Sequence, residues 1–172
     1  MNLQRFTEKA QEAVSAAKEL AIGSQHQELA IEHLLVALAE QQDGVVPRIL
    51  RLQSVDAVGF ARDIRRVLGT RPRISSASQL YLDSKLEAAL SAAENERERL
   101  HDDYVSTEHL FLGCLEKASG ESARVLQAAG LNRDAVYAAL AGLRGSQRVT
   151  DQNPESKYEA LQIGRASCRE RV

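Results

Sequence analysis

The feature that most constrains this chain is an internal repeat. A shift of 76 positions places residues 9–50 onto residues 85–126 without a gap. Identical pairs run through the whole range: Lys9/Lys85, Ala13/Ala89, Ser15/Ser91, Ala16/Ala92, Ala17/Ala93, Glu32/Glu108, His33/His109, Leu34/Leu110, Glu40/Glu116, Gly44/Gly120, Arg48/Arg124 and Leu50/Leu126. A repeat at one fixed offset indicates that a single structural unit occurs twice.

The repeated unit has the pattern of amphipathic helices. In the first copy, apolar residues recur at spacings of three and four, as at Phe6, Ala10, Ala13, Val14 and Ala17, and the second copy keeps the same spacing. Hydrophobic residues make up 44% of the chain, but only 4% are aromatic and none is Trp. A core of short aliphatic side chains is typical of packed helices.

Helix start signals are duplicated as well. Thr7 aligns with Asp83, and Asp56 aligns with Asn132, and each can accept a hydrogen bond from a free N–H at a helix N-terminus. We therefore predict an all-α fold of two tandem four-helix repeats related by a pseudo-twofold axis. The eight helices are expected near 7–22, 30–41, 45–53, 56–68, 79–101, 106–117, 121–129 and 132–144.

The domain organisation follows from where this pattern stops. Residues 1–145 form the predicted domain, with repeat one at about 6–68 and repeat two at about 82–144. The Gly-, Pro- and Ser-containing stretch 69–78 is an expected exposed connection, and 146–162 an expected polar linker toward a further module. Residues 163–172 break the rhythm and are interpreted as a tail foreign to the domain, so Cys168 enters no functional argument.

Composition and charge exclude several classes of function. The formal net charge is −2 and basic residues are mixed with acidic ones, which disfavours nucleic acid as a partner. The sequence lacks a Gly-Lys pair, and with it a Walker-type phosphate loop. Two cysteines provide neither a disulfide framework nor a metal site. No apolar stretch approaches a membrane span, and this absence together with the low cysteine content leads us to expect a cytoplasmic protein. The missing nucleotide-binding motifs lead us to expect no cofactor.

The two Glu-His pairs, Glu32-His33 and Glu108-His109, are the most conspicuous polar motif. Adjacent helical residues point about 100° apart, so one pair is poorly placed to chelate one metal ion. The histidines are expected to bond a neighbouring loop, and the glutamates to complement the positive helix N-termini. A carboxylate at a helix start can equally meet the N–H groups or a basic side chain of an incoming peptide. Both interpretations remain open.

Three parts of the sequence resemble the N-terminal domain of the ClpB protein disaggregases. They are the Thr7-Glu8-Lys9-Ala10 opening, the Glu-His-Leu repeats and the stretch 145–155, which contains Val-Thr-Asp-Gln-Asn-Pro-Glu. The similarity covers residues 1 to about 162. It implies a mobile, non-catalytic head on a hexameric ATP-driven chaperone, which captures unfolded or aggregated polypeptides and works with a DnaK-type chaperone.

The resemblance also implies a binding site. The substrate-contacting polar positions of the family correspond to Thr7, Asp102 and Glu108, and Glu32 is the internal counterpart of Glu108. These groups would surround a shallow apolar groove between the repeats, with Leu90 and Leu110 as candidates for its floor. As an alternative, both leucines belong to the ordinary core.

Other functions stay open at this point. A ClpC-like domain would keep the fold and use Glu32 and Glu108 to receive adaptor proteins or phosphorylated arginine. A hydrolase would use the Glu-His pairs with a bound metal. A helical spacer would have no ligand of its own.

Overall fold

The computed structural model describes residues 2–75 and 79–161 of the 172-residue chain. After a 3-10 turn at Leu3–Arg5, its helices are α1 (Glu8–Gly23), α2 (Ile31–Glu40), α3 (Val45–Leu52), α4 (Ala57–Leu68), α5 (Ser84–Arg99), α6 (Thr107–Lys117), α7 (Gly120–Ala128) and α8 (Arg133–Arg144). Residues 155–161 are the described part of a further helical segment. None of the helices within the described ranges is long and apolar enough to cross a membrane. The predicted all-α fold is confirmed.

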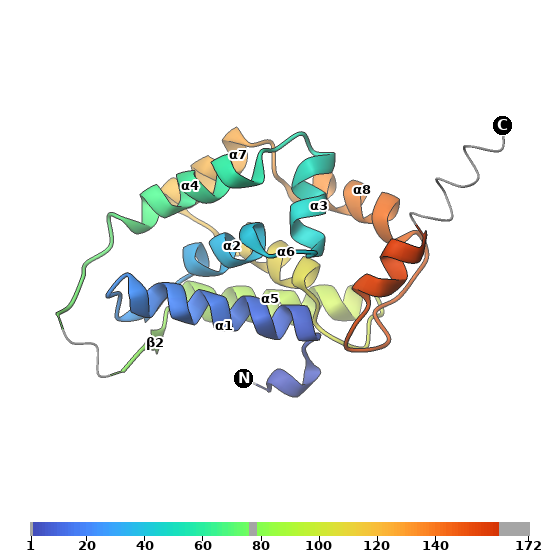
Figure 1. The fold of residues 1–172 in the computed structure, drawn as a ribbon, viewed down its shortest axis with the longest axis horizontal. Coiled ribbons are helices and arrows are strands. Elements are labelled where there is room, and N and C mark those ends of the chain that lie inside the picture. Colours follow the sequence, from blue (N-terminus) through green and yellow to red (C-terminus); the bar gives the residue numbers. More distant parts are fainter. Residues whose placement is uncertain (1, 76–78, 162–172) are drawn as a thin grey trace.

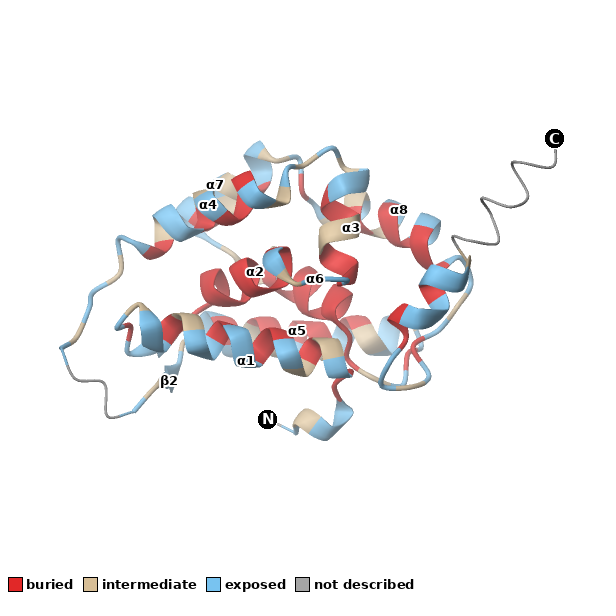
Figure 2. Ribbon diagram, viewed as in Figure 1, coloured by how far each residue is buried: buried red, intermediate tan, exposed pale blue. Residues whose placement is uncertain are grey.

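The helices form three layers (Figure 1). Helices α1 and α5 lie on one side, α2 and α6 in the middle, and α3, α4, α7 and α8 on the other side. Helices α2 and α6 form the centre of the core, because residues 31–39 of α2 and 107–114 of α6 are all buried (Figure 2). These two helices begin with the Glu-His pairs, so the fold buries both motifs.

Side-chain caps start the helices as the sequence predicts. The Thr7 hydroxyl accepts the N–H of Ala10 at 3.2 Å, and the Asp83 carboxylate accepts that of Lys85 at 2.8 Å. Asp56 and Asn132 cap α4 and α8 in the same way. Each cap satisfies an N–H that the helix leaves free, and is worth about 1 kcal/mol.

The two repeats contact each other through reciprocal strand pairings. Strand β1 (Glu28–Leu29) pairs in parallel with β2 (Tyr81–Leu82), and an isolated bridge joins Phe6 to Val105. Shifting the pair Leu29 and Leu82 by 76 positions in opposite directions gives Val105 and Phe6, which are the two residues of the bridge. Each repeat therefore holds the other through the same pairing, as a pseudo-twofold axis requires.

The segment after α8 lies against the domain. Gly145, with φ of +56°, turns the chain, and Val149 and Tyr158 are buried. In Figure 1 this segment lies at the end of the molecule where α1 begins. The prediction of a linker at 146–162 is untested, but residues 149–158 pack on the body. The predicted tail 163–172, with Cys168, lies outside the described residues.

Candidate functional site

A buried ionic cluster lies at the start of α6. An Arg144 nitrogen is 2.6 Å from Asp102 Oδ1, and the other terminal nitrogen is 3.6 Å from Glu108 Oε1. The side chains of Asp102 and Glu108 are fully buried and that of Arg144 is 6% exposed. Burial alone would lower the pKa of Arg144, but Glu108 and Asp102 raise it, so the guanidinium stays charged.

His109 anchors this cluster to the backbone. Its Nδ1 accepts the N–H of Ser106 at 2.8 Å, which leaves the proton on Nε2 to donate to Asp102 Oδ2 at 2.8 Å. Burial tends to raise the pKa of Asp102, but the hydrogen bonds from His109, Arg144 and the Val149 N–H lower it overall. Asp102 is therefore held as a carboxylate. The expected role of His109, bonding the neighbouring loop, is confirmed.

The segment after α8 covers the cluster. The Val149 N–H donates to Asp102 Oδ1 at 2.7 Å, and the Tyr158 hydroxyl lies 3.5 Å from Glu108 Oε1. The Gln152 carbonyl accepts the N–H of Glu8 at 2.8 Å, next to the Thr7 cap. We call Asp102, Glu108 and Arg144, with the start of α1, the Glu108 site. The structure thus brings Thr7, Asp102 and Glu108 to one place, where they are buried.

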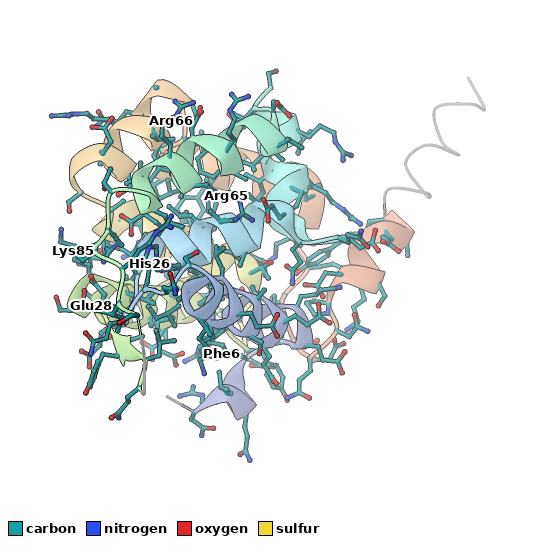
Figure 3. The ribbon with its side chains drawn as sticks, turned by 60° about the vertical axis from the view of Figure 1, so that its left-hand side comes forward. Phe6, His26, Glu28, Arg65, Arg66 and Lys85 are labelled. Atoms are coloured by element: carbon teal, nitrogen blue, oxygen red, sulfur yellow. The ribbon has the colours of Figure 1, made fainter. Side chains whose placement is uncertain are left out.

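A second cluster lies at the start of α2, and we call it the Glu32 site. The Arg71 guanidinium is 3.2 Å from Glu32, 3.4 Å from Asp83 and 3.5 Å from Glu28. Ser122 donates to Glu32 Oε1 at 2.8 Å. Figure 3 shows Glu28 on the same side of the molecule as Lys85 of α5. The side chain of Arg71 is 25% exposed, so this cluster is more open to solvent.

Two histidines support the Glu32 site. His33 Nδ1 accepts the Ala30 N–H at 3.0 Å, so its Nε2 carries the proton and donates to His26 Nδ1 at 2.8 Å. Burial, together with the neighbouring His26 and Arg71, lowers the pKa of His33 to about 4. Both rings are therefore neutral at pH 7. Within residues 2–75 and 79–161, no group of three or more His, Cys, Asp or Glu is placed to hold a metal ion.

The two predicted groove residues do not lie on an open surface. Leu110 is 1% exposed and belongs to the core, while Leu90 is half-buried against it. A hollow of about 590 Å³ does lie between α4 and α7, where the repeats meet, and its apolar lining includes Phe60, Val67 and Val125. None of the six predicted site residues lines this hollow, so the polar cluster and the apolar seam are separate places. The assignment of Leu90 and Leu110 to a binding groove stays a prediction.

The two arginines of these clusters, Arg144 and Arg71, were not among the predicted site residues. The repeat offset pairs Arg144 with Leu68, so a charged residue replaces a buried apolar one, and this mismatch was the available signal. Asp102 likewise aligns with His26, which marks the place where the two sites differ. Arg71 has no such signal, because it lies in the connection between the repeats.

Comparison with known proteins assigns the family. The sequence matches the family model of the Clp repeat (R) N-terminal domain over residues 5–157. The chain belongs to this family. A chaperone protein ClpB from Nitratidesulfovibrio vulgaris is 41% identical over 167 residues, which cover 94% of this chain. The match takes in only 19% of that relative, so the chain spans about a fifth of its length.

Solved structures show the same Clp N-terminal domain fold. The N-terminal domain of Hsp104 from Candida albicans superposes with a TM-score of 0.75 at 24% identity, covering 87% of this chain and 98% of that one. A ClpV N-domain in complex with a VipB peptide superposes with a TM-score of 0.66 at 17% identity, covering 81% and 86%.

Proposed function

We propose that this Clp N-terminal domain recruits unfolded or aggregated polypeptides for an ATP-dependent ClpB-type disaggregase. The observation that carries the proposal is the Glu108 site, where Asp102 and backbone groups beside it hold main-chain groups of the protein's own segment after α8. The ClpB relatives support the chaperone assignment, and the ClpV N-domain with its VipB peptide is a precedent for peptide binding on this fold.

Such binding is expected to be weak and independent of client sequence. Hydrogen bonds to a client's main chain recognise any extended segment, and a few buried apolar side chains add about 25 cal/mol per Å² of buried surface. Association costs remove much of that gain, which leaves micromolar to millimolar affinity. A recruiting head needs this range, because it has to release each client to the next step.

The wider assembly is part of the same proposal. Residues 146–162 would lead to an ATPase module, and the complete protein would form a cytoplasmic hexamer that cooperates with a DnaK-type chaperone. The domain itself would bind and not catalyse, and it would take no cofactor, nucleic acid or membrane.

Mapping of client contacts by NMR tests the proposal. Titration of the labelled chain with unfolded casein should shift amide resonances around Thr7, Asp102 and Glu108 first. A casein complex whose shifts scatter over the surface, or gather only at the α4–α7 hollow, would contradict the Glu108 site.

A ClpC-like function is the second candidate, and the Glu32 site favours it. Glu32, Glu28 and Asp83 already surround a guanidinium, that of Arg71. An arginine of an adaptor, or a phosphorylated arginine, would use the same carboxylates after replacing Arg71. Titration with free phosphoarginine distinguishes the two functions, because a recruiting head for unfolded chains should show no saturable shifts around Glu32.

A further inference from the structure

We propose that the segment Val149–Tyr158 is an internal occupant of the Glu108 site, and that a client binds there only after displacing it. The inference rests on the proposed function, since it concerns the same site. It adds a description of the ligand: an irregular stretch that places an aliphatic residue at Asp102, followed by a helical turn that places an aromatic residue at Glu108.

The first contact shows how main chain is bound. Val149 uses both of its backbone groups, because its N–H donates to Asp102 Oδ1 at 2.7 Å and its carbonyl accepts the Asp103 N–H at 2.8 Å. Its side chain is completely buried. These hydrogen bonds involve only the backbone of Val149, and the pocket takes only its aliphatic side chain, so many sequences can replace it.

The second contact lies at the start of α1. The Gln152 carbonyl accepts the Glu8 N–H at 2.8 Å, one of the N–H groups that a helix leaves free in its first turn. The Gln152 side chain also donates to the Gln4 carbonyl at 3.2 Å. A client carbonyl placed there would make the same bond beside Thr7, which explains why Thr7 groups with Asp102 and Glu108.

The third contact fills the rest of the site. Tyr158 is 1% exposed, and its hydroxyl faces Glu108 Oε1 at 3.5 Å. Burial and the neighbouring Glu108 raise its pKa, so Tyr158 stays neutral and its hydroxyl acts as the donor. An aromatic ring with a donor at its tip suits a pocket that has apolar walls and a carboxylate floor.

One residue of the segment opposes docking. Glu155 is 5% exposed, and neither of its carboxylate oxygens accepts a hydrogen bond from another residue in the described part of the chain. A buried carboxylate without a partner is costly. The segment is therefore docked against an internal penalty, which favours its displacement.

The same residue makes occupancy depend on pH. Burial raises the pKa of Glu155 to about 7, and the nearby charged groups are Glu108 of α6 and Lys9 and Glu12 of α1. The docked segment therefore binds a proton that the released segment, with a carboxyl pKa near its ordinary 4.5, does not hold. Docking should weaken as pH rises from 4.5 to about 7, and clients should bind more tightly over that range.

Binding of fluorescently labelled casein to variants of the full chain tests the proposal. Tyr158→Ala should loosen the segment and tighten casein binding by about fivefold, because the measured Kd falls as the open fraction rises. Glu155→Gln removes the buried charge, so casein should bind more weakly than to the wild type, and the gap should be wider at pH 8 than at pH 6. Ser15→Ala, at an exposed position of α1 outside the segment, should leave Kd unchanged.

The two variants are expected to change the Kd for casein in opposite directions. Simple unfolding cannot explain such a result, because it cannot tighten binding in one variant and weaken it in the other. Casein that binds equally well to wild type, Tyr158→Ala and Glu155→Gln would overturn the internal occupant and leave the proposed function standing. Casein that binds to none of them, with circular dichroism showing folded protein, would overturn both.

Discussion

The Glu32 and Glu108 sites occupy equivalent positions in the two repeats and differ in how they are closed. Both begin a central helix with Glu-His, and both include the cap of the other repeat's first helix, Asp83 or Thr7. The Glu108 site is sealed by the buried Arg144 and by the C-terminal segment. The Glu32 site is covered by Arg71 from the connection, which water still reaches.

The difference lies in side chains around a shared backbone frame. The backbone frame of each site is retained, since His33 and His109 both accept the N–H three residues before them. What changed are side chains around it: His26 stands where the other repeat has Asp102. Both clusters hold a guanidinium, but only the Glu108 site also accepts a main-chain N–H from the segment after α8.

Replacing the arginine of each site should give the largest difference in stability between the two sites. Arg144→Met leaves Asp102 and Glu108 buried without their cation, and should lower the free energy of unfolding by about 3–5 kcal/mol. Arg71→Met removes a partly exposed partner, and should cost about 1 kcal/mol or less. Urea unfolding measures both. Equal losses would mean that the two sites are equally sealed.

A substitution in α6 tests how closely the central helix of repeat two packs on α5, the first helix of the same repeat. Gly113 of α6 aligns with Ala37 of α2, and a Cβ at Gly113 would lie 2.2 Å from the Ala89 carbonyl oxygen of α5. Gly113→Ala should therefore cost about 3 kcal/mol in thermal or urea unfolding. Gly142→Ala is the matched control, because its added Cβ meets nothing within 4 Å, and it should stabilise slightly.

Acidification should reveal the neutral histidines of the Glu32 site. The unfolded chain binds a proton at His33 near pH 6.5, whereas the folded chain does so only near pH 4. The free energy of unfolding should therefore fall as pH drops from 6.5 to 4, by on the order of 2 kcal/mol. His26→Asp copies the other repeat, and should raise the His33 pKa in an NMR titration. An unchanged His33 pKa would contradict the assigned partner.

Removal of the helix caps should have the smallest effect on the free energy of unfolding. Thr7→Ala removes the cap of α1 and Asp83→Ala that of α5, and each should cost about 1 kcal/mol in unfolding experiments. Thr7→Ser keeps the cap. Casein binding that falls in Thr7→Ala but stays normal in Thr7→Ser would show that binding needs the Thr7 hydroxyl, whereas loss in both would show that it also needs the methyl group, which takes no part in the cap.

The fold was predictable because its signals are local. The helices are predicted by the apolar spacing and by the caps at Thr7, Asp83, Asp56 and Asn132. The constant offset of the repeat predicts that two copies of one unit are related by a pseudo-twofold axis. The expected helix at 79–101 begins later, at Ser84, because residues 81–82 pair with β1. A strand of two residues leaves no alternating pattern, so only the pairing partner reveals it.

The site was predictable in part. Thr7, Asp102 and Glu108 came from a family resemblance, and the structure groups them. Their burial was not expected, because it depends on Arg144 and on a segment that sequence pattern alone assigns to a polar linker. Contacts between residues far apart in the chain, such as Asp102 with Val149, have no periodic signal in the sequence.

The crossed pairing of Leu29 with Leu82 and of Phe6 with Val105 has a consequence for how such a domain can arise. A polypeptide with a single repeat would leave both of its pairing edges open, and a second identical molecule would close them through an isologous dimer. Joining the two copies in one gene turns that homodimer into a monomer. It also frees each half to mutate separately, as a symmetric dimer cannot.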